Sequence, residues 1–258
     1  MRRRLFALAL LAGGLATAAN DAARASADSE PFASMPYALW RVVHYLCAPT
    51  HAIGLTTPCE DVKYEGTGGY AILAVNSNHI LTVPTTRITG IESRVLLRPG
   101  QPNYWQAAWA AQSYLKAARR APLPRDMAGL ALNSADGRSQ EQLHIHTGCV
   151  FPFVLSTLAG LRLKPEDGWR PLSSRLPGGR YRVRAVLGAD LTHIDVFGLL
   201  EPSLRADEDA MSQQTIAVAG AIIGGQPGFY VLNASSANGM DAHAEGLLDF
   251  TCAIAKMR

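Results

Sequence analysis

Short, largely apolar runs separated by turn-forming residues recur along the chain, and this pattern favours β-strands. The clearest pair, residues 70–75 and 79–84, flanks the turn-forming sequence Asn76-Ser77-Asn78 and predicts a β-hairpin. Further strands are predicted over residues 127–133, 142–150, 181–187, 194–200, 215–223 and 229–232. The pattern therefore indicates a sheet that continues, antiparallel, into the C-terminal half.

Three segments have the apolar spacing of helices instead. They are residues 38–47, residues 102–120 and the closing residues 242–255. The second of them begins with Pro-Asn, a helix start signal, and ends in a turn of basic residues. The fold class predicted from these elements is α+β, with an antiparallel sheet flanked by helices.

The N-terminus carries an export pattern. Arg2, Arg3 and Arg4 precede an apolar stretch over residues 5–19, and Ala16-Thr17-Ala18 offers a cleavage site. The same segment is also consistent with a short anchor that is retained in the membrane. We expect residues 1–27 to be a signal peptide or N-terminal membrane anchor, and residues 28–258 to form one catalytic domain.

Composition narrows the class of protein. Charged residues are 17% of the chain and apolar residues 48%, which favours a folded domain over a disordered one. The net charge of +3 is too small to indicate nucleic-acid binding.

Four cysteines in an exported chain favour disulfides, and we expect the pairs Cys47 with Cys59 and Cys149 with Cys252. The pairing does not follow from the sequence alone, and buried thiols are the alternative. Zinc is disfavoured because the chain contains no C-x-x-C pair.

The segment that carries candidate chemistry reads Gln142-Leu143-His144-Ile145-His146. Because alternate side chains of a strand share a face, Gln142, His144 and His146 are expected to line up together. Leu143 and Ile145 then point into a core, which directs the polar row at a cleft.

Two histidines at this spacing have three explanations. They can be structural or exposed residues, or ligands of a metal, for which His193 and His243 are distant further candidates. They can also supply a neutral imidazole that attacks phosphorus. The spacing alone does not separate the three.

Around this row the sequence resembles the histidine-triad superfamily, with Gln142 in place of the first histidine, an Asn at position 133 after a strand, and a strand-Pro-basic segment over residues 81–88. Longer segments of the sequence resemble the CDP-diacylglycerol pyrophosphatase family. They are residues 38–40, 43–44, 88–93, 102–104 and 137–146, together with the closing stretch around Leu248 and Cys252.

The resemblance implies a histidine-triad-like fold, extended by a C-terminal antiparallel β region, and hydrolysis of CDP-diacylglycerol to CMP and phosphatidate. It implies that His144 is the nucleophile, that His146 holds phosphate oxygens, and that Ser139 contacts the leaving oxygen. The further site residues it implies are Gln142 for catalysis and Asn133, Gly137 and Arg138 for substrate binding.

Gln142 departs from the triad pattern. An amide donates a hydrogen bond but cannot supply a proton to a leaving group. A phosphate monoester leaves without that proton, so the departure favours pyrophosphate cleavage over phosphoramidate cleavage.

We expect no metal or cofactor, and a location at the bacterial inner membrane with the catalytic domain in the periplasm. The expected partners are CDP-diacylglycerol, CMP and a membrane surface or anchor; the oligomeric state stays open. The alternatives are a histidine-triad enzyme of soluble nucleotides, a non-catalytic periplasmic module that binds nucleotide or lipid, and a disfavoured metal-binding protein.

Two smaller groups complete the expectations. One strand face carries three arginines, Arg180, Arg182 and Arg184. We expect this face to lie either in solvent or against the phosphate of a lipid or an anionic membrane. Structural or surface roles are expected for the remaining histidines, His44, His51, His79, His193 and His243.

Overall fold

The computed structural model describes residues 35–55, 57–119, 121–204, 210–237 and 242–256. The expected signal or anchor segment, residues 1–27, lies outside these ranges. Within them, no helix is both long and apolar enough to cross a membrane.

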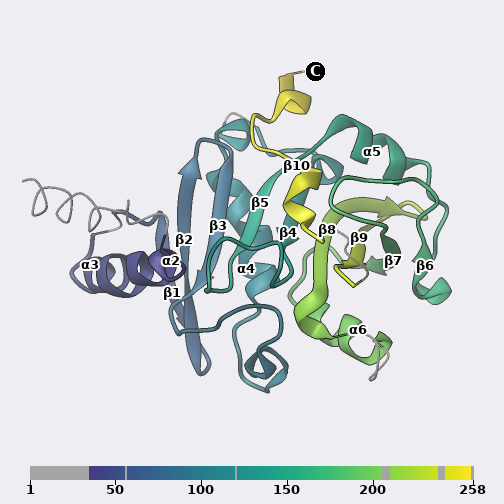
Figure 1. Cartoon of the computed structure of the whole chain (residues 1–258). Coiled ribbons are helices and arrows are strands. Elements are labelled where there is room, and N and C mark those ends of the chain that lie inside the picture. Colours follow the sequence, from purple (N-terminus) through teal and green to yellow (C-terminus); the bar gives the residue numbers. More distant parts are fainter. Residues whose placement is uncertain (1–34, 56, 120, 205–209, 238–241, 257–258) are drawn as a thin grey trace, which may run out of the picture.

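In the part of the chain that the structure describes, ten strands form one sheet whose paired neighbours are antiparallel (Figure 1). The strand order is β1-β2-β3-β5-β4-β8-β9-β7-β6, and β10 pairs with β5. The bounds are β1 Asp61–Glu65, β2 Gly68–Asn76, β3 His79–Pro84, β4 Ala128–Leu132, β5 Ile145–Val150, β6 Arg170–Pro171, β7 Arg182–Leu187, β8 Gln214–Ile223, β9 Gln226–Ser235 and β10 Leu248–Asp249. The predicted mixture of helices with an antiparallel sheet is confirmed, and so is the hairpin of β2 and β3.

The strand order repeats itself about the β4–β8 pair. Strands β2 to β5 lie in the order β2-β3-β5-β4, and strands β6 to β9 lie in the equivalent order β6-β7-β9-β8. The residue row that begins at His146 continues through Ala131 and Ala217 to Leu232 of β9. In this row β5 of the first half therefore carries His146, whereas β8 and β9 of the second half carry Ala217 and Leu232.

Helices cover the sheet and its edges (Figure 1). The α-helices are α2 Ala38–Val42, α3 Ala48–Ala52, α4 Tyr104–Ala110, α5 Pro152–Ala159 and α6 Val196–Leu200; a π-helical turn, Val43–Cys47, joins α2 to α3. The 3-10 helices are Arg94–Leu97, Ala111–Tyr114, Lys116–Ala118, Arg125–Met127, Pro165–Asp167, Glu201–Ser203, Met211–Gln213, Ala244–Leu247 and Ala253–Lys256.

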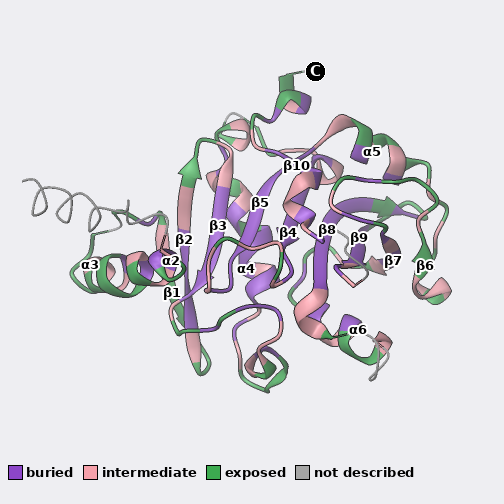
Figure 2. Cartoon of the chain, in the orientation of Figure 1, coloured by how far each residue is buried: buried purple, intermediate pink, exposed green. Residues whose placement is uncertain are grey.

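The core lies on both faces of the central strands, which are buried along most of their length (Figure 2). On one face, Trp105 and Ala108 of α4 pack with Ile145 of β5. Thr147 of β5 donates to the carbonyl of Ala108 at 3.0 Å, which fixes α4 against this strand. Burial on both faces holds β5 in place, and with it the histidines at its beginning.

The helix predicted over residues 102–120 ends early. The α-helix stops at Ala110, and Leu115 is extended. The hairpin turn accounts for this, because Ser77 and Asn78 accept hydrogen bonds from the backbone amides of Lys116 and Ala117 at 2.7 and 2.9 Å. Those amides are thus lost to a continuing helix.

The strand predicted over residues 194–200 is wrong, because this segment contains helix α6. The Asp195 side chain caps the helix by accepting from Gly198 N at 2.9 Å. Val196, Phe197 and Leu200 are buried, a spacing that suits one face of a helix.

The closing helix predicted over residues 242–255 is also wrong. The segment divides into two 3-10 helices on either side of β10, which pairs with the end of β5 at Cys149 and Val150. A disulfide joins Cys149 to Cys252 there, and a second joins Cys47 to Cys59. These are the two pairs expected from the sequence.

Candidate functional site

His144 lies immediately before β5, near the middle of the sheet. The strand begins at Ile145 rather than at residue 142 as predicted, because Leu143 N donates to the carbonyl of Ile88 at 2.6 Å instead of joining the ladder. Leu143 and Ile145 are buried in the core, as the alternation predicted.

The ring of His144 is held by its own chain. Its Nδ1 lies 2.6 Å from the carbonyl oxygen of Gln142, and a carbonyl only accepts, so the hydrogen is on Nδ1. The neutral ring consequently has its lone pair on Nε2. Nε2 of His144 has no hydrogen-bond partner among the described residues. It is also absent from the group of nitrogens that are both buried from solvent and without a partner, so this atom is not fully buried. A ligand can therefore approach it.

Burial keeps this ring neutral. His144 is 6% exposed, and burial, followed by the nearby His146, lowers its pKa to about 3. An imidazole is nucleophilic only when neutral, so His144 stays reactive throughout the neutral pH range.

His146 lies between two partners. Its Nδ1 is 2.8 Å from Nε2 of His79, and its Nε2 is 3.0 Å from Oε2 of Glu245. The ring of His146 also meets the ring of His144 edge to face, with the centroids 4.9 Å apart. These contacts fix the orientation of His146 beside the nucleophile candidate.

The charges in this cluster follow from its surroundings. The hydrogen-bonding contact with His146 lowers the pKa of Glu245 to about 2, so Glu245 is an anion. Burial, followed by the nearby His146, lowers the pKa of His79 to about 4, so His79 is neutral. A neutral imidazole and an anionic carboxylate therefore lie on either side of His146.

His79 belongs to this cluster through its contact with His146, where the sequence analysis expected a structural or surface role. It is the first residue of β3, which pairs with β5, and its ring stacks on Phe250 at 3.6 Å between centroids. Gly148 of β5 leaves room for this stack, since a Cβ there would lie 3.0 Å from the Phe250 ring. The position of His79 at the start of a predicted strand could have indicated from the sequence that it lies near His146.

Asn133 reaches the cluster through the backbone. It follows β4, is 4% exposed, and accepts from Glu245 N at 3.2 Å through its side-chain oxygen. Ser134 holds the same segment by donating to the carbonyl of Ala242 at 2.8 Å. The structure thus brings Asn133 together with His146 and with Glu245, a residue that the sequence analysis missed because it predicted a helix there.

The side chain of Gln142 is not free to take the catalytic role expected from the sequence. Its amide nitrogen donates to the carbonyls of Pro84 and Thr86 at 3.0 and 2.9 Å, and its oxygen accepts from Ile88 N at 3.3 Å. The amide is fully used in fixing residues 84–88. The contribution of Gln142 to the site is the carbonyl that binds His144.

Two carboxylates engage the guanidinium of Arg138. It binds both oxygens of Glu92, at 2.8 and 3.0 Å, and Glu141 at 2.8 Å, while its side chain is only 7% exposed. These ion pairs hold the loop before His144, and the expected contact of Arg138 with the substrate stays a prediction. Gly90 leaves space for this guanidinium, which a Cβ would overlap.

The remaining loop residues are positioned differently. Gly137 lies against the closing segment, where a Cβ would be 2.8 Å from the carbonyl of Ala242. Ser139 is exposed on the loop. Gly137 therefore serves close packing, and the expected contact of Ser139 with a leaving oxygen stays a prediction.

The other histidines lie apart from this cluster or beside it. His44 is exposed and stacks on Trp40, and His193 is exposed on a loop. His243 lies beside Gly137. Within the ranges that the structure describes, no group of three or more His, Cys, Asp or Glu side chains is arranged to hold a metal ion.

Comparison with known proteins shows the family of this chain. The profile of the family described as "CDH: CDP-diacylglycerol pyrophosphatase" matches residues 34–256. A "Probable CDP-diacylglycerol pyrophosphatase" of Mycobacterium leprae (strain TN) is 32% identical over 231 residues, which cover 88% of this chain and 84% of the relative. A "CDP-diacylglycerol pyrophosphatase" of Yersinia pestis is 33% identical over 227 residues, which cover 84% of each chain. The chain belongs to the CDP-diacylglycerol pyrophosphatase family of hydrolases.

Proposed function

We propose that this protein hydrolyses CDP-diacylglycerol to CMP and phosphatidate, with Nε2 of His144 as the nucleophile. The observation that carries the proposal is the 2.6 Å hydrogen bond from Nδ1 of His144 to the Gln142 carbonyl. It leaves the lone pair on Nε2, in a ring that burial keeps neutral.

In the first step, Nε2 forms a bond to the phosphorus next to cytidine. The bond from this phosphorus to the bridging oxygen breaks, and phosphatidate takes the electron pair. A phosphate monoester has a second pKa of about 6, so it leaves without a proton from the enzyme. This agrees with a site in which the Gln142 amide is bound to backbone and no third histidine takes its place.

In the second step, a water oxygen bonds to the same phosphorus and the bond to Nε2 breaks. CMP is released, the lone pair returns to His144, and one proton of the water passes to the medium. The covalent nucleotidyl-histidine divides one displacement into two, each with a good nucleophile or leaving group.

The neighbours of His144 have separate tasks in this proposal. His146 donates its Nε2 hydrogen to a phosphate oxygen, and Glu245 keeps that hydrogen in place until the substrate binds. His79 is a positioning residue that holds His146 through Nδ1. Asn133 holds the backbone of Glu245, and the exposed Ser139 contacts the leaving oxygen once the substrate is bound.

We further propose that the fold is related to the histidine-triad superfamily and that the domain faces the periplasm from the inner membrane. An antiparallel sheet with a central histidine strand supports the first point. The arginines followed by an apolar stretch over residues 5–19 support the second, as do two disulfides, which persist in oxidising compartments.

A substrate comparison tests the proposed function. Purified protein is expected to release CMP and phosphatidate from CDP-diacylglycerol, with and without a chelator, and to cleave a nucleoside phosphoramidate far more slowly. The phosphoramidate needs a proton on its leaving amine, and Gln142, which takes the place of the first histidine of the triad, cannot supply one. Faster cleavage of the phosphoramidate would show that the substrate class is wrong.

A further inference from the structure

The carboxylate of Glu245 lies where the proposed function places an oxygen of the substrate phosphate. Oε2 of Glu245 is 3.0 Å from Nε2 of His146, the nitrogen that is proposed to bind that oxygen. The side chain of His146 is 6% exposed and that of Glu245 is 39% exposed, so the carboxylate is the more exposed partner. A phosphate that reaches Nε2 must therefore displace this carboxylate or share the nitrogen with it.

The backbone around Glu245 keeps the carboxylate close by after such a displacement. The amide of Glu245 donates to Oδ1 of Asn133 at 3.2 Å, and the amide of Ala244 donates to Oγ1 of Thr215 at 2.9 Å. Ala244, Asn133 and Thr215 are all buried. The carboxylate can therefore move by rotation of its own side chain while its backbone stays in place.

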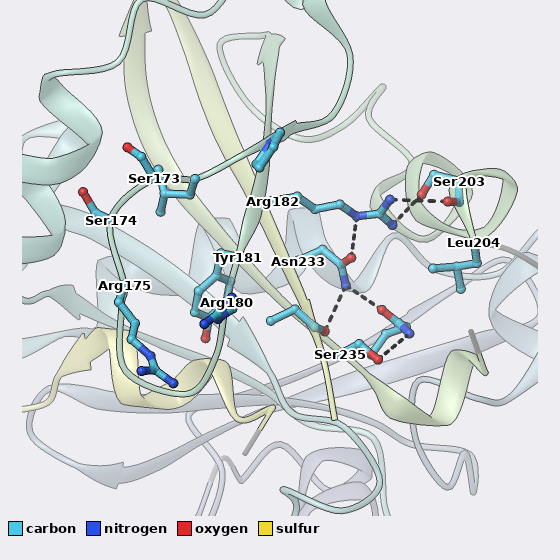
Figure 3. Close-up of a pocket in the computed structure, with 14 residues that line it drawn as sticks. Ser173, Ser174, Arg175, Arg180, Tyr181, Arg182, Ser203, Leu204, Asn233 and Ser235 are labelled. Carbon is cyan, nitrogen blue, oxygen red and sulfur yellow. Dashed lines mark hydrogen bonds between the residues drawn. The ribbon is translucent and has the colours of Figure 1, made fainter. Parts of the chain in front are cut away.

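The closing segment brings Glu245 back to the first half of the sheet. Glu245 follows β9 in the sequence, yet its carboxylate contacts His146 of β5. In β9, the strand equivalent to β5, Asn233 accepts from Nε of Arg182 at 2.8 Å, beside a pocket on the second half of the sheet (Figure 3). The contact between a histidine and Glu245 thus lies at β5, next to the nucleophile candidate.

An anion that binds at this place meets the negative charge of Glu245. The contact with His146 lowers the pKa of Glu245 to about 2, so the carboxylate is ionised at neutral pH. Arg138 carries a positive charge close enough to affect the pKa of His144, but two carboxylates already engage its guanidinium. Its attraction for a further anion is therefore reduced.

The substrate and its product differ in the charge on the phosphate next to cytidine. In CDP-diacylglycerol this phosphate is bonded on both sides and carries one negative charge. In CMP it is a monoester with a second pKa of about 6, so it carries two negative charges at higher pH. Because Coulomb repulsion grows with charge, a carboxylate at this place repels the phosphate of the product more strongly than that of the substrate.

We infer that the Glu245 carboxylate makes this site select singly charged phosphates that are bonded on both sides, and that it promotes the departure of doubly charged CMP. The inference rests on the proposed function, which places the phosphate at Nε2 of His146. Glu245 is thus a specificity-determining residue, which lowers the affinity of the site for nucleoside monophosphates.

Calorimetric titration of the full chain at pH 8 with CMP and with the methyl ester of CMP tests this. The two ligands differ by one methyl group and one negative charge. The unaltered protein is expected to bind the ester about 10-fold more tightly, because the extra charge of CMP lies close to a carboxylate. In Glu245→Gln, which keeps the shape of the side chain and removes its charge, CMP is expected to bind more tightly, to within about 2-fold of the ester. Glu245→Ala is expected to shift this preference in the same direction.

Glu60→Gln is the matched control, since it makes the same change at an exposed carboxylate. Glu60 precedes β1, which is three strands from β5. At that separation solvent and salt screen its charge, so the preference for the ester is expected to stay within about 2-fold of that of the unaltered protein.

Three results would overturn the inference. They are equal affinity of the unaltered protein for the two ligands, an undiminished preference for the ester in both Glu245 variants, and a preference that disappears because the ester binds more weakly. The last result would assign Glu245 to positioning His146 alone. Because the titrations involve no turnover, failure of the proposed hydrolysis is read separately, as the absence of CMP release from CDP-diacylglycerol by the unaltered protein.

Discussion

Replacing His144 with alanine is expected to lower kcat for CDP-diacylglycerol by about ten-thousand-fold or more, because it removes the atom that bonds to phosphorus. Neighbouring groups would still bind the substrate, so KM is expected to change much less. Steady-state release of CMP measures both constants. The wild-type Nε2 is positioned by the carbonyl of Gln142, and alanine offers no substitute.

His193→Ala is the matched control, since His193 is exposed on a loop outside the cluster. It is expected to keep kcat within about 2-fold of the unaltered protein, as exposed substitutions have small effects. Circular dichroism of both variants establishes that they are folded. A folded His144→Ala protein that keeps a tenth or more of the activity would contradict the assignment of the nucleophile.

Loss of the Cys149–Cys252 disulfide is expected to have the largest effect on stability. The two cysteines are 103 residues apart, and closing a loop of that size stabilises the folded state by about 4.7 kcal/mol in the chain-entropy model. Denaturant unfolding of Cys149→Ala/Cys252→Ala measures the loss. Activity is expected to fall as well, because the bond fixes the closing segment that carries Glu245 beside His146.

The second disulfide provides the comparison. Cys47 and Cys59 are 12 residues apart, so Cys47→Ala/Cys59→Ala is expected to lose only about 3 kcal/mol and to keep more of the activity. Equal losses of stability and activity in the two double variants would show that loop size and the closing segment do not decide the effect.

The local pattern of short, largely apolar runs between turn-forming residues predicted much of the sheet. It located the hairpin of β2 and β3 and the buried positions of Leu143 and Ile145, because a strand pattern is local and is read directly from consecutive residues. It failed over residues 194–200, where one capping Asp and three buried residues suit a short helix equally well. A run of seven residues is too short to distinguish the spacing of a strand from the spacing of a helix.

Long-range contacts decided the other failures. The closing segment has helical spacing, but its pairing with β5 and the bond to Cys149 determine its path. The helix after Tyr104 ends where the turn at Asn78 takes its amides. Neither partner lies near these segments in the sequence.

The site was predictable in part for the same reason. His144 and His146 follow from a local pattern and from resemblance, and Asn133 from its place after a strand. The contact of His146 with Glu245 joins residues 99 positions apart, and the pairing of Arg138 with Glu92 joins residues 46 apart. The sequence does not show that two carboxylates engage Arg138, because Glu92 lies far from it along the chain.

The most direct test of the central claim is to trap the covalent intermediate. CDP-diacylglycerol labelled in the phosphorus next to cytidine is mixed with the protein, denaturant is added during turnover, and the label that stays on the polypeptide is mapped by peptide mass spectrometry. The account predicts a labelled cytidylyl group on His144, absent from the His144→Ala protein. Label on another residue, or equal label on the His144→Ala protein, would contradict it.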